Sequence, residues 1–146
     1  MFDLLSIPAG FLSLKCYLGG TMYSEKLTKQ VIGACFDVSN ELGLGFLESV
    51  YEKALLVVLQ EKGLKARSQV PVKVSFRGQS VGEFFADIIV EDELILELKA
   101  VKSLAPEHIA QVLNYLRATG RKTGLLVNFG KAKLEYRRFD NRLLTV

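Results

Sequence analysis

The hydrophobic pattern of the sequence changes its period near residue 69, and this change fixes the order of secondary structure. Apolar residues recur every three to four positions across residues 24–42 and 46–62, which predicts two helices. They then alternate with polar residues in QVPVKVSFR (69–77), and EFFADIIV (83–90) and LILELKAV (94–101) continue as strands. The chain is therefore predicted to open with two helices and to continue into a three-stranded meander.

The rest of the chain predicts one more helix and one or two strands. Pro106 can open a helix because its missing N–H is not needed there, and Gly120 can end it. TGLLVNFG (123–130) is almost wholly apolar, as expected of a strand at the buried centre of a mixed sheet, and KLEYRRF (133–139) is compatible with an edge strand. The expected order is α-α-β-β-β-α-β-β, an α/β fold with a mixed central sheet and flanking helices.

Local signals indicate the ends and the buried faces of these elements. Ser24 is expected to cap the first helix, and Phe46 and Leu47 to begin the buried stripe of the second. Cys35 lies in the apolar pattern of the first helix and is expected in the core. The first strand should present one face to the core through its alternating apolar residues, Val70, Val72, Val74 and Phe76.

The length of 146 residues suggests a single domain, which we expect to span residues 22–146. Residues 1–21 are apolar, but an acid, a proline and a lysine interrupt them, so we expect neither a signal peptide nor a membrane span. We interpret this segment as a poorly structured extension, with Met22 as a candidate for the native start. Detection of Met1 by mass spectrometry of the native protein would exclude that start.

Composition narrows the compartment and the partners only slightly. Cys16 and Cys35 lack CxxC spacing, so free thiols in a reducing, cytoplasmic setting are expected. The single histidine, His108, cannot build a His-rich metal site, and a surface or helix N-terminal position is expected for it. A net charge of +3 and a pI near 8.9 are compatible with a nucleic-acid partner and equally common in other cytosolic proteins.

The stretch ADIIVEDELILELKAV (86–101) places charged residues inside two strands that otherwise suit a core. Asp87 interrupts the first strand, and Glu97 and Lys99 interrupt the second. An apolar β-branched residue would pack better at each of these positions. The three charges therefore need an explanation beyond folding.

The turn between these strands decides whether the charges meet. A three-residue turn, Glu91–Glu93, would pair Val90 with Leu94 and set Asp87 directly opposite Glu97 on one face. The lysine two residues after the second acid would share that face. A two-residue turn would place the two acids on opposite faces. The sequence permits both turns.

Two opposed carboxylates repel each other, at a cost of up to ~1 kcal/mol on an exposed sheet and more when desolvated. A divalent cation between them would remove this cost, because Mg²⁺ prefers oxygen ligands and typically takes one or two carboxylates with water and phosphate. A nearby lysine can orient water or offset charge on a phosphate. The competing interpretation is a salt bridge on a solvated sheet face, and the short D…ExK pattern alone favours it.

Two further motifs place polar residues on the helices beside these strands. GFLESVY carries Glu48 and Tyr51 three residues apart on one face of the second helix. QVLNY carries Gln111 and Tyr115 four residues apart on one face of the third. Each motif taken alone has little specificity.

Taken together, these motifs resemble the PD-(D/E)XK nuclease superfamily, whose RecB-like branch carries the Gln-xxx-Tyr signature. More narrowly, Gly45, Glu48 and Tyr51 match the small GxxExxY family of bacterial and archaeal proteins, and the likeness runs from about residue 24 to 140. The resemblance implies a restriction-endonuclease-like core and nuclease activity. Ala86 replaces the proline that commonly precedes the first acid, at a loosely kept position.

The resemblance also implies roles for the acid–acid–lysine set. Asp87 and Glu97 would bind Mg²⁺ or Mn²⁺, with the Leu98 carbonyl as a possible third ligand. Lys99 would position the attacking water. Glu48 would be an auxiliary ligand or would orient a metal-bound water.

The Gln-xxx-Tyr pair would support these groups. The resemblance implies that Gln111 holds the lysine or a substrate phosphate, with Tyr115 beside it. Plain alternatives exist for each helix residue: an exposed acid favoured by the helix dipole for Glu48, a surface amide for Gln111, and half-buried packing for Tyr51 and Tyr115.

A nuclease of this kind would take DNA or RNA as its partner, with no membrane involved, and a homodimer is a candidate assembly. Four basic residues are candidates for holding the phosphate backbone: Lys102, Arg117, Arg121 and Lys122. The alternative function is a nuclease-like module that binds nucleic acid or protein without cutting, because the chain has no recognisable DNA-reading motif.

Overall fold

The computed structural model describes residues 21–141. Their order of elements is the predicted one: α1 (Thr21–Leu42), α2 (Glu48–Glu61), β1 (Ala66–Phe76), β2 (Gln79–Val90), β3 (Leu94–Lys99), α3 (Pro106–Thr119), β4 (Thr123–Asn128) and β5 (Glu135–Asp140). The expected N-terminal extension lies outside the described residues except for Thr21, which begins α1, and Cys16 lies outside them as well. No helix in the described part is long and apolar enough to cross a bilayer.

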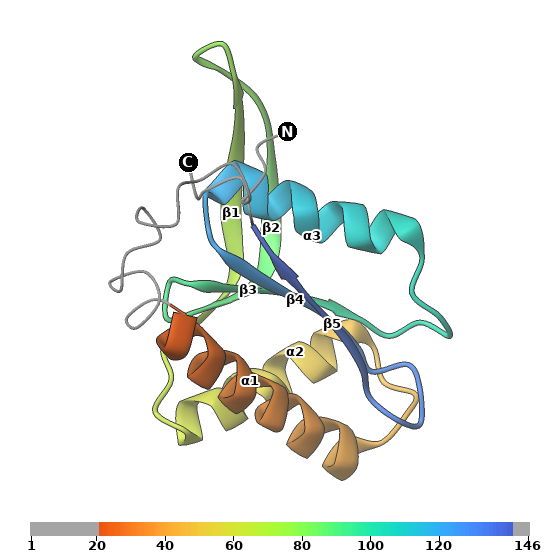
Figure 1. Cartoon of the computed structure of the whole chain (residues 1–146). Coiled ribbons are helices and arrows are strands. Elements are labelled where there is room, and N and C mark those ends of the chain that lie inside the picture. Colours follow the sequence, from red (N-terminus) through yellow and green to blue (C-terminus); the bar gives the residue numbers. More distant parts are fainter. Residues whose placement is uncertain (1–20, 142–146) are drawn as a thin grey trace.

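The five strands form one mixed sheet in the order β1-β2-β3-β4-β5. β3 and β4 are parallel, and every other neighbouring pair is antiparallel. α1 and α2 cover one face of the sheet and α3 covers the other (Figure 1). The expected mixed sheet with flanking helices is confirmed, and β5 lies at an edge as expected.

The alternation of β3 divides the core into two layers. Leu94, Leu96 and Leu98 pack with α1 and α2, whereas Ile95 packs with α3. Glu97 is two residues after Ile95, so it points to the α3 side of the sheet. Apart from this carboxyl and Lys99 at its end, β3 is apolar on both faces.

The core of α1 includes Cys35, as the apolar pattern predicts. The residue is 1% exposed, and burial raises the pKa of its thiol to about 12. A thiol with so high a pKa stays neutral and packs as a small apolar side chain.

β1 and β2 form a long hairpin that projects past α3 (Figure 1). Its turn is Arg77–Gly78, where both residues have positive φ angles of 50° and 78°, and Phe76 pairs with Gln79. The register shifts between Val74 and Ser75. Val70 and Val72 are buried as expected, but Phe76 is 60% exposed, because the hairpin extends beyond the helix that would cover it.

The hairpin changes layers near Gln69. Ala66 and Ile88 pack with α1 and α2, whereas Val70 and Ala86 pack with α3. Simple alternation would keep residues of the same parity on one face, so the ribbon must bend between these pairs. Gln69 supplies the bend through its left-handed φ of 49°.

Two expectations about helix ends are wrong. α1 begins at Thr21, so Ser24 lies inside the helix and does not cap it. α2 begins at Glu48, so Phe46 and Leu47 precede the helix and are 46% and 76% exposed instead of forming a buried stripe. At the third helix the expectation holds, since α3 begins at Pro106 and ends against Gly120 in the left-handed conformation.

His108 belongs to the start of α3. Its Nδ1 accepts a hydrogen bond from the Ala105 N–H at 3.0 Å, which satisfies one of the free donors at the helix N-terminus. This is the helix N-terminal position that the sequence predicts.

Candidate functional site

The turn between β2 and β3 is the three-residue one. Val90 pairs with Leu94, and the Glu93 N–H donates to the Val90 carbonyl at 3.0 Å. Glu91 and Asp92 take positive φ angles of 52° and 56°, as a tight turn requires. The three-residue turn and its pairing of Val90 with Leu94 are therefore confirmed, and the two-residue turn is wrong.

Asp87 lies where β2 leaves β3. The ladder between the two strands ends at the pair Ile88 and Leu96, and beyond it the strands separate. The Leu98 N–H then donates to Asp87 Oδ2 at 2.8 Å, so a side-chain carboxylate takes the place of a ladder carbonyl. This bond holds Asp87 beside the acid of β3.

Glu97 is a buried carboxyl group with an incomplete set of partners. It is 3% exposed, and its Oε2 has no hydrogen-bond partner among the described residues. Lys99 Nζ lies 3.7 Å from Oε1, which is an ion pair beyond hydrogen-bond length. Within the described part of the chain, Oε2 is the only such buried side-chain oxygen or nitrogen.

The surroundings of Glu97 raise its pKa to about 9. Burial contributes most, followed by the charge of Asp87; the charge of Glu48 adds to the rise, and the charge of Lys99 opposes it. An opposite charge at this site therefore stabilises the carboxylate form, as a bound cation would.

Gln111 and Tyr115 approach the acids from α3. Gln111 Nε2 donates to the Tyr115 hydroxyl at 2.8 Å, and that hydroxyl donates to the Phe85 carbonyl at 3.4 Å. Tyr115 is 5% exposed and stacks on Phe84 at 4.5 Å between centroids. Burial, and then the charge of Glu97, raise the pKa of Tyr115. The predicted pair is therefore linked by a hydrogen bond, and Tyr115 lies close enough to Glu97 to feel its charge.

Glu48 approaches from α2, where it is exposed in the first turn. Its charge contributes to the raised pKa values of Glu97 and Glu52, so the three carboxylates share one electrostatic environment. The positive end of the helix dipole favours an acid at this position. The charge of Glu48 therefore acts on the other carboxylates, and its exposed position in the first turn of α2 is also what the helix dipole alone would favour.

Tyr51 holds the loop before Glu48. It is 1% exposed, its hydroxyl donates to the Gly43 carbonyl at 2.6 Å, and it accepts the Phe46 N–H at 3.3 Å. Gly45 has a φ of 103°, which favours glycine. The G-x-x-E-x-x-Y spacing therefore builds the turn from which α2 starts, and Tyr51 acts on the site through this turn and not by direct contact.

Two residues beside the acids carry no signal that the sequence interpretation used. Gln69 Nε2 donates to both carboxylate oxygens of Glu52, at 3.2 and 3.1 Å, and to Asp87 Oδ1 at 3.4 Å. Burial raises the pKa of Glu52, against the hydrogen bond from Gln69. Glu52 follows Glu48 by four residues, so helical spacing could have found it. No spacing in the sequence indicates Gln69, and only the bend in the structure reveals it.

The loop after Lys99 is fixed by a buried amide. Asn128 Oδ1 accepts the N–H groups of Val101 and Gly130, at 3.0 and 2.9 Å, and Asn128 Nδ2 donates to the Val101 carbonyl at 2.9 Å. A Cβ atom at Gly130 would lie 2.2 Å from that carbonyl oxygen, so only glycine fits. These contacts hold the end of β3, and with it the backbone of Lys99.

The structure does not bring two of the predicted backbone-binding residues to this site. Arg121 forms an ion pair with Asp92, and Lys122 directly precedes Thr123. Thr123 pairs with Leu94, five residues before Lys99, which places Arg121 and Lys122 roughly 17 Å along the strand from that lysine. The parallel register thus puts both residues at the far end of β3 from Lys99, and their contact with a nucleic-acid backbone stays a prediction.

The other two predicted basic residues are exposed. Lys102 follows Lys99 in the loop after β3. Arg117 lies on α3 and lines a shallow hollow with Lys73 and Phe84 of the hairpin. Neither has a salt bridge within the described chain.

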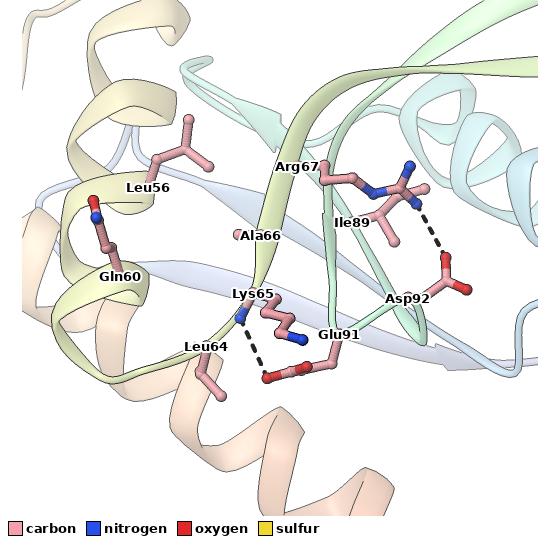
Figure 2. Close-up of a pocket in the computed structure, with 9 residues that line it drawn as sticks. All are labelled: Leu56, Gln60, Leu64, Lys65, Ala66, Arg67, Ile89, Glu91 and Asp92. Atoms are coloured by element: carbon pink, nitrogen blue, oxygen red, sulfur yellow. Dashed lines mark hydrogen bonds and ion pairs between the residues drawn. The ribbon is translucent and has the colours of Figure 1, made fainter.

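A larger hollow, of about 920 Å³, lies away from the acids, between α2 and the start of β1 (Figure 2). Its charged groups pair with the chain itself: Arg67 with Asp92 at 3.0 Å, and the Lys65 N–H with Glu91 at 3.2 Å. No acid of the site lines it. The larger of these two hollows therefore does not coincide with the candidate site around Asp87 and Glu97.

Comparison with known proteins decides the family. The sequence model of the family described as "PD-(D/E)XK nuclease superfamily" matches residues 25–139. The chain belongs to the PD-(D/E)XK nuclease superfamily.

A solved structure agrees with the restriction-endonuclease-like fold of this superfamily member. The structure described as "Crystal structure of SSO0001" superposes with a TM-score of 0.53 at 18% sequence identity. The match covers 82% of this chain and 61% of that one, so this chain spans less than two thirds of its length. At this identity the likeness shows the fold alone. No curated protein matches the chain.

The residues of this superfamily member fit a divalent cation in part. Residues 21–141 contain no group of three or more His, Cys, Asp or Glu side chains placed to hold an ion. Mg²⁺ and Mn²⁺ need fewer, since one or two carboxylates with water and substrate phosphate suffice for Mg²⁺. The unpartnered Oε2 of buried Glu97, beside Asp87, supplies this minimal set.

Proposed function

We propose that this chain is a divalent-metal-dependent nuclease that hydrolyses phosphodiester bonds of DNA or RNA. One observation carries the proposal: Glu97 is a buried carboxyl group with an oxygen that no described donor satisfies. Leaving a buried acceptor unpaired costs roughly 1–3 kcal/mol, and more when the group is charged. A bound cation accounts for an acid that the fold alone does not need.

Asp87 and Glu97 would hold Mg²⁺ or Mn²⁺, with the Leu98 carbonyl as a third candidate ligand. A bound ion of this kind supplies Lewis-acid stabilisation of the phosphate and lowers the pKa of water. The chain prepares for it by fixing Asp87 through the Leu98 N–H, which orients one carboxylate towards the other.

Lys99 acts as a fixed positive charge beside the scissile phosphate. Its ammonium is held near Glu97 and its side chain is 16% exposed, so it can reach a bound substrate while shielded from bulk water. Hydrolysis bonds a water oxygen to phosphorus and breaks the bond to the 3′ oxygen, which takes a proton and leaves a 5′-phosphate end. Lys99 orients the water and offsets the charge that builds on the phosphate.

The helix residues support this centre. Gln111 donates to the Tyr115 hydroxyl, which in turn bonds the hairpin at Phe85. In the proposed role, Gln111 would hold Lys99 or a substrate phosphate. Glu48 orients water or serves as an auxiliary ligand from the start of α2. The match of Gly45, Glu48 and Tyr51 supports membership of the GxxExxY family. The single domain over residues 22–146, the start at Met22 and a homodimer stay predictions.

A cleavage assay tests the proposal. We expect the wild-type protein to cut DNA or RNA in Mg²⁺ or Mn²⁺, to stop cutting in EDTA, and to lose at least a hundredfold in rate in the Lys99→Ala variant. Lys29→Ala, on the exposed surface of α1, is the matched control and should cut as the wild type does. A wild type that cuts neither nucleic acid in either metal contradicts the proposal.

A non-cleaving nuclease-like module is the second candidate. Both oxygens of Asp87 accept hydrogen bonds from the chain, Oδ2 from the Leu98 N–H and Oδ1 from Gln69, so Asp87 is held in place without a metal as well. Binding of nucleic acid that is unchanged by metal, together with no cleavage, would favour this function over hydrolysis.

A further inference from the structure

Exposed apolar side chains lie near two of the acids along the chain, on two different elements. Phe85 precedes Asp87 by two residues on β2 and is 50% exposed. On the loop before Glu48, Phe46 and Leu47 are 46% and 76% exposed. Phosphodiester hydrolysis itself does not require apolar groups, so these side chains need another reason.

Phe85 is exposed because its two neighbours face α3. Phe84 stacks on Tyr115, and Ala86 is buried in the same layer. Successive side chains of a strand point to opposite faces, so Phe85 points away from α3. Its carbonyl accepts the Tyr115 hydroxyl at 3.4 Å, which fixes the backbone while the ring stays free.

The face of the hairpin that carries Phe85 forms a small platform. Phe85 pairs across the ladder with Pro71, which is also exposed. Lys73, two residues after Pro71, is exposed and pairs across the ladder with the exposed acid Glu83. An exposed aromatic ring and a flat proline are therefore continuous with the strand that carries Asp87.

Nucleic-acid chemistry selects the occupant of this platform. The bases of a duplex are stacked on one another and present mainly phosphates and sugars, so an exposed phenylalanine finds little to contact. A single strand offers a free π-face on every base, and aromatic stacking is its usual mode of recognition. The described residues also include no helix-turn-helix or other groove-reading motif.

We propose that the substrate is single-stranded nucleic acid and that Phe85 stacks on one of its bases. The inference rests on the proposed function, because hydrolysis at Asp87 and Glu97 is what makes nucleic acid the substrate.

Fluorescence anisotropy with a labelled single strand of mixed sequence, in EDTA so that cleavage does not intervene, measures the affinity. We expect Phe85→Ala to weaken single-strand binding about tenfold, within the range that one stacked base supports. Phe85→Trp should retain the affinity, since it keeps the π-face. Phe76→Ala is the matched control: Phe76 is 60% exposed at the hairpin turn, so its loss should leave the affinity unchanged.

The inference would be overturned if the matching duplex bound as tightly as the single strand, or if Phe85→Ala bound like the wild type. Equal weakening of binding by Phe76→Ala and Phe85→Ala would overturn it too. A change in oligomeric state in Phe85→Ala without a change in affinity would also overturn it, and would assign the platform to contact between copies. Thermal unfolding of each variant checks that it is folded.

Parallel cleavage assays separate this inference from the proposed function. Binding that depends on Phe85 in a protein that never cuts supports the single-strand inference and contradicts hydrolysis. Preferential cutting of duplex that Phe85→Ala does not change contradicts the inference and leaves hydrolysis standing.

Discussion

At the scale of single residues, Glu97 is the group that the fold explains least. Ile95, two residues earlier on the same face, is buried among apolar side chains, and a carboxyl at the next such position loses hydration that Lys99 at 3.7 Å only partly replaces. The pKa of about 9 follows mainly from this burial. In the absence of a cation, the carboxyl is therefore mostly protonated at neutral pH.

This pKa predicts how stability depends on pH in the metal-free protein. Between the ordinary value of 4.5 and about 9, the folded state keeps a proton that the unfolded state releases, so the free energy of unfolding falls as pH rises. We expect Glu97→Gln, which cannot ionise, to show a shallower fall between roughly pH 5 and 8 than the wild type. Urea unfolding in EDTA at several pH values measures this.

Glu93→Gln is the control for that experiment, because Glu93 is exposed in the turn before β3. It should follow the wild-type curve. Equal slopes for Glu97→Gln and the wild type would show that the carboxyl is not held protonated by the fold.

At the scale of elements, the start of α2 depends on the buried tyrosine of the G-x-x-E-x-x-Y motif. The Tyr51 ring stacks on Phe129 at 4.7 Å, and its hydroxyl binds the loop at Gly43 and Phe46. The ring therefore belongs to the core, and the hydroxyl sets where the helix begins. The loop therefore determines where Glu48, the first residue of α2, lies.

We expect Tyr51→Phe to lower the free energy of unfolding by about 1 kcal/mol, the usual net value of such a hydrogen bond. The ring packing is unchanged, and water can reach the freed groups because Gly43 and Phe46 are exposed. Denaturant titration checks the value. Tyr136→Phe, an exposed tyrosine on β5, should change stability little; equal losses in both variants would refute a special role for the Tyr51 hydroxyl.

Periodicity predicted these elements well because it reflects burial, and the acidic turn Glu91–Glu93 fixed the register of the acids. It failed where tertiary structure overrides local pattern. The exposure of Phe76 follows from a hairpin longer than the helix that covers it, and the bend at Gln69 comes from one positive φ angle that no spacing reveals. Phe46 and Leu47 were wrongly expected in the buried stripe of α2, because apolar side chains occur both on the buried face of a helix and in an exposed loop before it.

At the scale of the whole molecule, the candidate site lies where β2 and β3 separate and both helical layers can reach the gap. Asp87 contacts Gln69 of the hairpin, Gln111 and Tyr115 come from α3, and the charge of Glu48 comes from α2. The sequence motifs named these residues except Gln69, which no spacing indicates. Arg121 and Lys122 were grouped with them in the prediction, and only the parallel register of β3 and β4 shows that they lie at the far end of β3 from Lys99.

Calorimetric titration of Mn²⁺ or Mg²⁺ into the metal-free protein tests the central claim most directly. We expect saturable binding by the wild type, loss of binding in Glu97→Gln, and unchanged binding in Glu83→Gln, an exposed acid on the hairpin. Absence of binding in the wild type, or equal binding in Glu97→Gln, would contradict a cation site built on the buried carboxylate of Glu97.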